Sequence, residues 1–129
     1  MRVLLADNQP RVRLALRALL EQLPGLKIVG EAVDAQDLLI QAEATCPELV
    51  LLHWRLNGSA ATNLLSDLRR ACPSLCVIAL SVRPEACRAA LAAGADAFVS
   101  KTEPPERLLG AILALQQMES AKCTGKSWS

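Results

Sequence analysis

Polar residues that can do chemistry stand directly after the short apolar runs of this sequence. They are an acid and an amide (Asp7, Asn8), the single histidine (His53), a serine (Ser81) and a lysine (Lys101). An imidazole can act as a nucleophile, carry a proton or bind a transition metal, and the other groups can hold ions beside it. Each residue alone indicates little, so their meaning depends on the elements that position them.

Five apolar runs predict β-strands, and the segments between them have the leucine and alanine spacing of amphipathic helices. The predicted strands are RVLLAD (2–7), KIVGEA (27–32), LVLLHW (49–54), CVIALS (76–81) and AFVSK (97–101). Residues that start or stop helices follow each strand. The first helix lies between Pro10 and Pro24-Gly25, and the second begins at the N-cap Asp34 and ends at Cys46-Pro47. The third lies between Asn57-Gly58 and Pro73, the fourth between Pro84 and Gly94, and Pro104-Pro105 opens the fifth.

The alternation of strand and helix indicates an α/β fold, a doubly wound (βα)5 three-layer sandwich around an open parallel sheet of five strands. In such sheets, ligands bind beyond the carboxyl ends of the strands. The sequence therefore predicts that Asp7, His53, Ser81 and Lys101 outline one polar pocket.

Composition excludes several classes of function. The chain has 129 residues, which suits one domain, and 52% hydrophobic residues, which suits a sizeable core. The net charge of +1 gives no general attraction to nucleic acid or to a membrane, and 2% aromatic residues do not make a base-stacking platform. No apolar run approaches the roughly 20 residues that span a bilayer. We expect a cytoplasmic protein.

The five cysteines are odd in number and form no CxxC motif. A disulfide framework or a zinc site is therefore poorly supported. We expect reduced cysteines that pack as small hydrophobic residues.

From Arg2 to about Met118, the order and spacing of these segments resemble the receiver domain of two-component response regulators, a CheY-like, flavodoxin-like fold. The NarL/LuxR-type regulators are the most similar. LLADNQP resembles their acidic-pair segment, LVLLHWRLNG their phospho-acceptor strand, VIALS their hydroxyl-bearing strand, and AFVSKTEPPERLLGAI their lysine strand and last helix. The resemblance implies a strand order of 2-1-3-4-5, with a receiver-like domain at 1–119 and a flexible tail or the start of a linker at 120–129.

The resemblance also implies roles for the matching positions. Asp7 matches one member of the acidic pair at the metal site, and Asn8 stands where the family usually has the second acid. His53 occupies the position of the phosphorylated aspartate. Arg55 matches the residue whose backbone carbonyl completes the metal site, and Ser81 matches the hydroxyl that bonds the phosphoryl group. Phe98 matches the aromatic residue that rotates on activation, and Lys101 matches the lysine that neutralises the phosphoryl charge.

The departures from the family indicate a pocket that no longer takes phosphate. Asn8 and His53 remove two of three usual carboxylates. Mg²⁺ prefers oxygen ligands, for which neutral imidazole is a poor substitute, and an acyl phosphate cannot form without a carboxylate. Val82 stands where the family favours a small residue, and is expected to crowd access to residue 53. We expect no enzyme activity, no catalytic residue, no metal or other cofactor, and lost or weak Mg²⁺ binding.

The sequence thus predicts an atypical pseudo-receiver of a two-component or phosphorelay pathway that signals by protein–protein contact. Its expected partner is a histidine kinase, a phosphotransfer protein or an output domain, with a homodimer as a further possibility and no direct contact with nucleic acid or membrane. Two alternatives stay open. The chain is the N-terminal regulatory fragment of a NarL/LuxR-type DNA-binding regulator, or it is a degenerate receiver that senses a small molecule or pH.

Alternatives also stay open for single side chains. His53 is expected to fill the pocket and hydrogen-bond Asp7 or a backbone group; phosphorylation of its imidazole, pH-dependent pairing with Asp7 and transition-metal binding are the other hypotheses. Lys101 either pairs with Asp7 or is partly solvated. Arg11, Arg13 and Arg17 are expected to form a solvated helix face, with a partner surface as the alternative.

Overall fold

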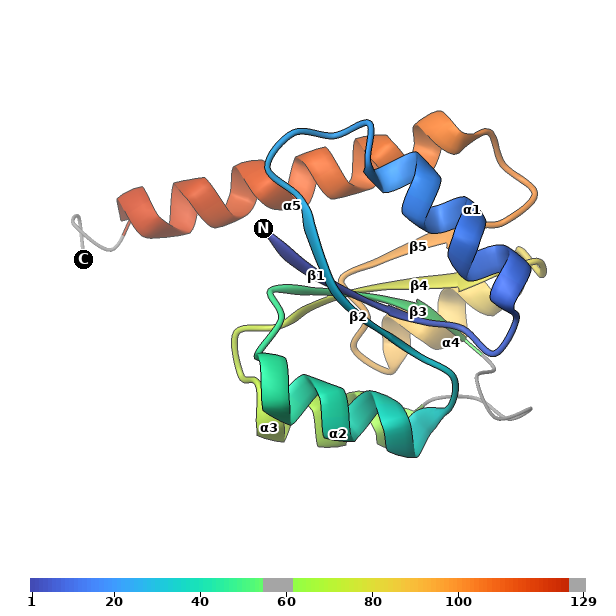
Figure 1. Cartoon of the computed structure of the whole chain (residues 1–129), viewed down its shortest axis with the longest axis horizontal. Helices are drawn as coiled ribbons and strands as arrows, with labels where there is room; N and C mark the ends of the chain where they lie inside the picture. Colours follow the sequence, from blue (N-terminus) through green and yellow to red (C-terminus); the bar gives the residue numbers. More distant parts are fainter. Residues whose placement is uncertain (55–61, 126–129) are drawn as a thin grey trace.

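A parallel sheet of five strands forms the centre of the protein (Figure 1). The structure, a computed structural model, describes residues 1–54 and 62–125. The strand order is β2-β1-β3-β4-β5 and every neighbouring pair is parallel, which confirms the predicted α/β topology. The strands agree with the predicted ranges to within one residue at their ends: β1 (Arg2–Ala6), β2 (Lys27–Ala32), β3 (Leu49–His53), β4 (Cys76–Ser81) and β5 (Ala97–Ser100).

Helices cover both faces of the sheet. They are α1 (Pro10–Leu20), α2 (Ala35–Thr45), α3 (Thr62–Ala71), α4 (Ala86–Ala92) and α5 (Pro105–Gly125). In Figure 1, α1 and α5 lie on one side of the sheet, and α2 and α3 lie beside each other on the opposite side with α4. The three-layer arrangement follows from the continuous apolar strands, which need a cover on each face.

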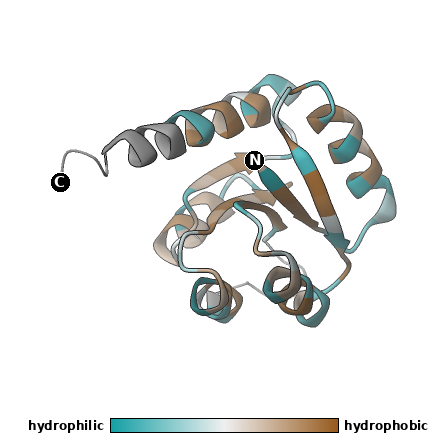
Figure 2. Cartoon of the chain, turned by 60° about the vertical axis from the view of Figure 1, so that its left-hand side comes forward, coloured by the Kyte–Doolittle hydropathy of each residue, from teal (hydrophilic) through white to brown (hydrophobic). Residues whose placement is uncertain are grey.

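Two apolar clusters fill the space between the sheet and the two helix layers. Successive strand residues point to opposite faces, so Leu52 packs toward α2, α3 and α4, whereas Leu51 packs toward α1 and α5. Figure 2 shows the apolar strands enclosed between helices with hydrophilic outer faces. Trp54, directly after β3, is 2% exposed within the first cluster. The rigid sheet thereby fixes the positions of the strand ends.

Helix ends show where local signals decide structure. Asp34 caps α2 as predicted, because its carboxylate accepts a hydrogen bond from the Asp37 N–H at 2.7 Å, and the Asp37 carboxylate accepts one in return from the Val33 N–H. The helix expected from Pro84 to Gly94 is shorter, since α4 spans Ala86–Ala92. The chain at Gly94 has a φ of +112°, which ends the helical path and favours glycine.

The last helix continues as backbone to Gly125, into the range expected to begin a tail or linker. Residues 126–129 lie outside the described part of the chain, so the domain boundary at 119 stays a prediction. Within the described ranges, no helix combines the length and the apolar character that crossing a bilayer requires.

Candidate functional site

The carboxyl ends of three strands of the sheet, β1, β3 and β5, bring an acid, an imidazole and an ammonium group together. Asp7 follows β1, His53 ends β3 and Lys101 follows β5. Lys101 Nζ lies 2.6 Å from Asp7 Oδ2 and 3.1 Å from His53 Nδ1. The Asp7 side chain is 1% exposed and that of Lys101 is 16% exposed, so the ion pair is largely shielded from water. Of the two readings of Lys101, the structure supports the ion pair with Asp7.

The Lys101 contact defines the state of His53. An ammonium group can only donate hydrogen bonds, so His53 Nδ1 accepts and the imidazole is neutral with its proton on Nε2. Burial lowers the pKa of His53 below its ordinary value, and the nearby Lys101 charge lowers this pKa further, whereas Asp7 and a backbone hydrogen bond with Leu80 act in the opposite direction. His53 therefore contacts a backbone group, which was one of its two expected partners, and its side-chain partner is Lys101 in place of Asp7.

The donor set around Asp7 does not fit the Mg²⁺ ion that the family fold implies. Asp7 Oδ2 holds Lys101, and Oδ1 accepts the Gln9 N–H at 2.9 Å, so both carboxylate oxygens already have hydrogen-bond donors. Asn8 is exposed, carries no charge and replaces the usual second acid. Mg²⁺ would therefore have to displace an ammonium group from a buried carboxylate, and residues 1–54 and 62–125 offer it few other hard oxygen ligands.

Two further results concern the metal ligands. Arg55, assigned to the metal site through its backbone carbonyl, lies outside the described residues, as do Asn57 and Gly58. Among the described residues, no group of three or more histidine, cysteine, aspartate or glutamate side chains is placed to hold a metal ion.

The two remaining positions that the resemblance singled out are Ser81, the last residue of β4, and Phe98, within β5. Ser81 is 4% exposed, and its hydroxyl oxygen accepts the Arg83 N–H at 3.0 Å, so it makes a local turn contact. Its backbone carbonyl accepts the Lys101 N–H at 2.8 Å, which fixes the start of the loop that carries the lysine. Phe98 is partly buried against the cluster under α2, α3 and α4. Val82, expected to crowd residue 53, is 57% exposed.

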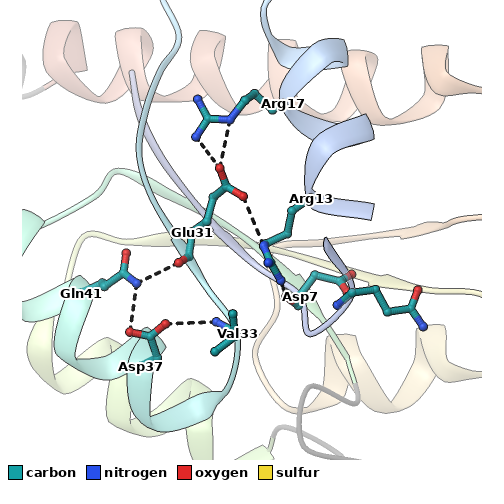
Figure 3. Close-up of polar contacts among 8 residues, drawn as sticks. Asp7, Arg13, Arg17, Glu31, Val33, Asp37 and Gln41 are labelled. Atoms are coloured by element: carbon teal, nitrogen blue, oxygen red, sulfur yellow. Dashed lines mark hydrogen bonds and ion pairs between the residues drawn. The ribbon is translucent and has the colours of Figure 1, made fainter. Parts of the chain in front are cut away.

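Next to the pocket lies an ion-pair network around Glu31, which the sequence did not predict (Figure 3). Glu31, in β2, pairs with both Arg13 and Arg17 of α1, and Arg13 also donates a hydrogen bond to the Asp7 backbone carbonyl at 2.5 Å. The Arg17 hydrogen bond, more than any other contact, holds the pKa of Glu31 below its ordinary value. Arg13 is 13% exposed and Arg17 is 41% exposed, so the expected solvated face is wrong for Arg13, whereas Arg17 is ion-paired and remains partly solvated.

The far side of Glu31 is anchored to α2. Gln41 Nε2 donates to the Glu31 carbonyl at 2.9 Å and to Asp37 Oδ1 at 3.0 Å (Figure 3). A Cβ atom on Gly30 would lie 2.2 Å from Gln41 Oε1, so a larger residue there would force the Gln41 amide out of this position. The network therefore links α1, β2 and α2 and supports the segment that carries Asp7.

A cavity of about 420 Å³ opens between α1 and α5, beside the pocket. Its wall is mainly apolar, with Val12 and Leu16 from α1 and Leu108 from α5, and Arg11 and Lys101 at its polar border. Lys101 thus belongs to both the ion-pair site and the rim of an apolar cavity.

Comparison with known proteins gives one consistent result. Residues 3–113 match the model of the response regulator receiver domain. The nitrate/nitrite response regulator protein NarL of Escherichia coli (strain K12) is 32% identical over 112 residues, which are 85% of this chain and 52% of NarL. NarP of the same strain is 33% identical over 114 residues, 87% of this chain and 53% of NarP. The chain therefore spans about half the length of these curated relatives.

Solved structures agree with the sequence relatives. A LuxR-family two-component response regulator from Aurantimonas sp. SI85-9A1 is 29% identical with a TM-score of 0.81, over 88% of this chain and 83% of that one. The isolated REC domain of RcsB from Salmonella enterica serovar Typhimurium is 28% identical with a TM-score of 0.82, over 91% of this chain and 88% of that one.

Proposed function

Because the chain belongs to the response regulator receiver family, we propose that it acts as an atypical receiver that signals through protein contacts without aspartyl phosphorylation. The observation that carries this proposal is the shared ammonium group of Lys101, which binds Asp7 and neutral His53 at once. Lys101 already neutralises the Asp7 carboxylate at the place where phosphorylation of a typical receiver would bring a metal ion and a phosphoryl group.

The chemistry of the three side chains supports this proposal. Phosphoryl transfer depends on positive groups placed around the equatorial oxygens and on a suitable nucleophile. Residue 53 offers an imidazole nitrogen, which cannot form an acyl phosphate, and Lys101 would have to leave the buried Asp7 carboxylate unpaired to reach a phosphoryl oxygen. We therefore assign no catalytic residue, no cofactor and no enzyme activity to the chain.

The partner in this proposal is a protein of the same signalling system: a histidine kinase, a phosphotransfer protein or an output domain. The family relationship supports this class of partner, and the ion-paired pocket supports a domain held in one conformation. A receiver held in one state would regulate its partner by abundance or by competition for binding instead of by phosphorylation.

The test is mass spectrometry of the intact chain after incubation with acetyl phosphate and Mg²⁺. We expect no phosphoryl adduct at residue 53. His53→Asp alone is expected to remain poorly phosphorylated, because Asn8 still lacks a charge and Lys101 still pairs with Asp7. The double variant Asn8→Asp/His53→Asp is the positive control, since it returns two carboxylates to the pocket.

A stoichiometric phospho-adduct on the unmodified chain at neutral pH would overturn the proposal. Efficient, Mg²⁺-dependent phosphorylation of His53→Asp alone would show that His53 is the one residue that prevents phosphorylation, and that Asn8 and the Lys101–Asp7 pair do not. Acid and base lability of an adduct would separate a phosphohistidine from an aspartyl phosphate.

A second candidate is the regulatory half of a longer DNA-binding regulator. A structure of RcsB from Salmonella enterica serovar Typhimurium bound to promoter P1flhDC is 27% identical to this chain. The match covers 91% of this chain but only 60% of the RcsB chain. The reading frame of the complete transcript tests this directly: a continuous helix-turn-helix segment downstream of the receiver supports it, and a stop codon contradicts it.

A third candidate is a sensor of small molecules, for which the apolar cavity beside Lys101 is the specific observation. A thermal-shift screen with metabolites tests it. A ligand that raises the unfolding temperature, and loses this effect in Leu16→Trp, would support the cavity as the site.

A further inference from the structure

Two cysteine side chains meet at the ends of neighbouring helices, far along the chain from each other. Cys46 is the C-cap of α2, and Cys72 directly follows α3. The Cys72 thiol contacts the Ala42 carbonyl oxygen at 3.4 Å, and the Cys46 thiol contacts the Glu43 carbonyl oxygen at 3.9 Å. The two thiols therefore both lie at the last turn of α2, against the carbonyl groups of two consecutive residues.

The two thiols differ in exposure. Cys46 is exposed, whereas Cys72 is 7% exposed and packs within the cluster under α2, α3 and α4. Burial is the main cause that raises the pKa of the Cys72 thiol, and the adjacent Cys46 raises this pKa further. A dissolved oxidant would therefore meet Cys46 first, with Cys72 behind it as the second thiol.

The backbone at Cys46 is unusual as well. Its φ of 45° is left-handed, the conformation in which a helix C-cap usually carries glycine or asparagine, and among the described residues no other non-glycine residue has a positive φ. The expectation that the cysteines pack as small hydrophobic residues fits Cys72 but not Cys46.

The other cysteines with described side chains are placed differently. Cys76, in β4, packs with the cluster under α1 and α5, on the opposite face of the sheet from Cys72. Cys87 lies in α4. The sheet thus separates Cys72 from Cys76 although only three residues lie between them.

We propose that Cys46 and Cys72 form an oxidisable dithiol site that reacts with hydroperoxides and closes to a disulfide between the ends of α2 and α3. In the first step, the Cys46 thiolate attacks one oxygen of hydrogen peroxide, so that an S–O bond forms, the O–O bond breaks, and the hydroxide that leaves takes up the proton that the thiol had released and becomes water. In the second step, Cys72 attacks the sulfenic sulfur, the S–S bond forms, the S–O bond breaks and a second water leaves. Two thiols are oxidised and one peroxide is reduced to two waters.

The site is independent of the proposed receiver function. Cys46 and Cys72 precede β3 and β4, so they lie at the amino ends of these strands, whereas His53 lies at the carboxyl end of β3. Phosphorylation of residue 53 and oxidation of the dithiol can therefore be tested separately.

The experiment treats the full chain with hydrogen peroxide, alkylates the remaining thiols and identifies the bridged peptides by mass spectrometry. We expect two of the five thiols to become protected, with a Cys46–Cys72 link, and full release by reductant. The linked form should unfold at a temperature higher by on the order of 5 °C than the reduced form. Five alkylatable thiols after treatment, a link that involves Cys76, or a link only between two chains would overturn the proposal.

Variants make the order of the steps testable. Cys72→Ala keeps a small apolar group in the buried site and should accumulate a dimedone-reactive sulfenic acid on Cys46. Cys46→Gly removes the thiol and suits the left-handed backbone, so it should fold at least as well as the original chain and form no link. Cys87→Ser is the matched control and should leave the link intact. Dimedone labelling of Cys72 in place of Cys46, or an undiminished disulfide in Cys46→Gly, would contradict the proposed site.

Discussion

Two carboxylates near the carboxyl edge of the sheet are neutralised in different ways. Asp7 is 1% exposed and depends on one ammonium group, Lys101, whose second contact is neutral His53. Glu31 is 29% exposed and is held by two guanidinium groups, Arg13 and Arg17. The Asp7 pair is buried and has one cation, whereas the Glu31 network is partly solvated and has two.

The difference indicates what each region contributes. Removal of one partner from a buried ion pair leaves an uncompensated charge, which costs far more than loss of a solvated contact. The Asp7 pair is therefore expected to determine both the stability and the chemistry of the pocket. The Glu31 network instead supports the pocket mechanically, because Arg13 also binds the Asp7 backbone carbonyl.

The largest effect should come from breaking the Asp7 pair. Lys101→Met leaves Asp7 buried without a cation, and we expect the free energy of unfolding to fall by about 3 kcal/mol. Urea denaturation followed by circular dichroism measures this. Asp7→Asn/Lys101→Met is the control, since it removes both charges and should recover most of the loss. A single variant within about 0.5 kcal/mol of the original chain would refute the importance of this pair.

A smaller effect should come from the Glu31 network. Glu31→Gln keeps the side-chain shape and removes the charge, and we expect a loss of about 1 kcal/mol that shrinks as salt is added, because solvent screens these partly exposed groups. Arg107→Gln is the matched control, since it breaks an exposed pair with Glu103 and should change stability by less than about 0.5 kcal/mol. An effect of Glu31→Gln as large as that of Lys101→Met would abolish the contrast between the two regions.

The smallest effect concerns the pH dependence of stability. The pKa of His53 is lower in the folded chain than its ordinary value of 6.5, so between these two values the unfolded chain binds more protons than the folded chain. The His53 contribution is therefore fully present above about pH 6.5 and is lost as the pH falls toward the folded pKa. Denaturation at several pH values should show this loss for the original chain, and His53→Asn should remove it. A greater stability at acidic pH that depends on His53 would show that the sign is wrong.

Much of the fold could be predicted because its signals are local. The ranges of β2 and β4 follow from apolar runs, and the α2 N-cap follows from Asp34 and the residue three positions later. The meeting of Asp7, His53 and Lys101 was predicted as well, because parallel strand ends share one edge of a sheet.

The contacts that were missed depend on partners far along the chain. Arg13 and Arg17 have the spacing of an exposed helix face, and nothing within α1 shows that Glu31 of a different element lies opposite them. The available signal was Glu31 itself, a charged residue near the end of a strand that has no other charged residue after Lys27. The preference of His53 for Lys101 over Asp7 depends on side-chain reach, which the order of residues does not determine.

The central claim is that Lys101 neutralises Asp7 and so excludes Mg²⁺ from the pocket. The most direct test is a Mg²⁺ titration of the original chain and of Asn8→Asp/His53→Asp, followed by amide chemical shifts around Asp7 and by calorimetry. We expect no saturable binding to the original chain at millimolar Mg²⁺ and measurable binding to the double variant, since only the latter offers enough hard oxygen ligands to compete with Lys101. Saturable Mg²⁺ binding by the original chain, with shifts at Asp7 and Lys101, would contradict it.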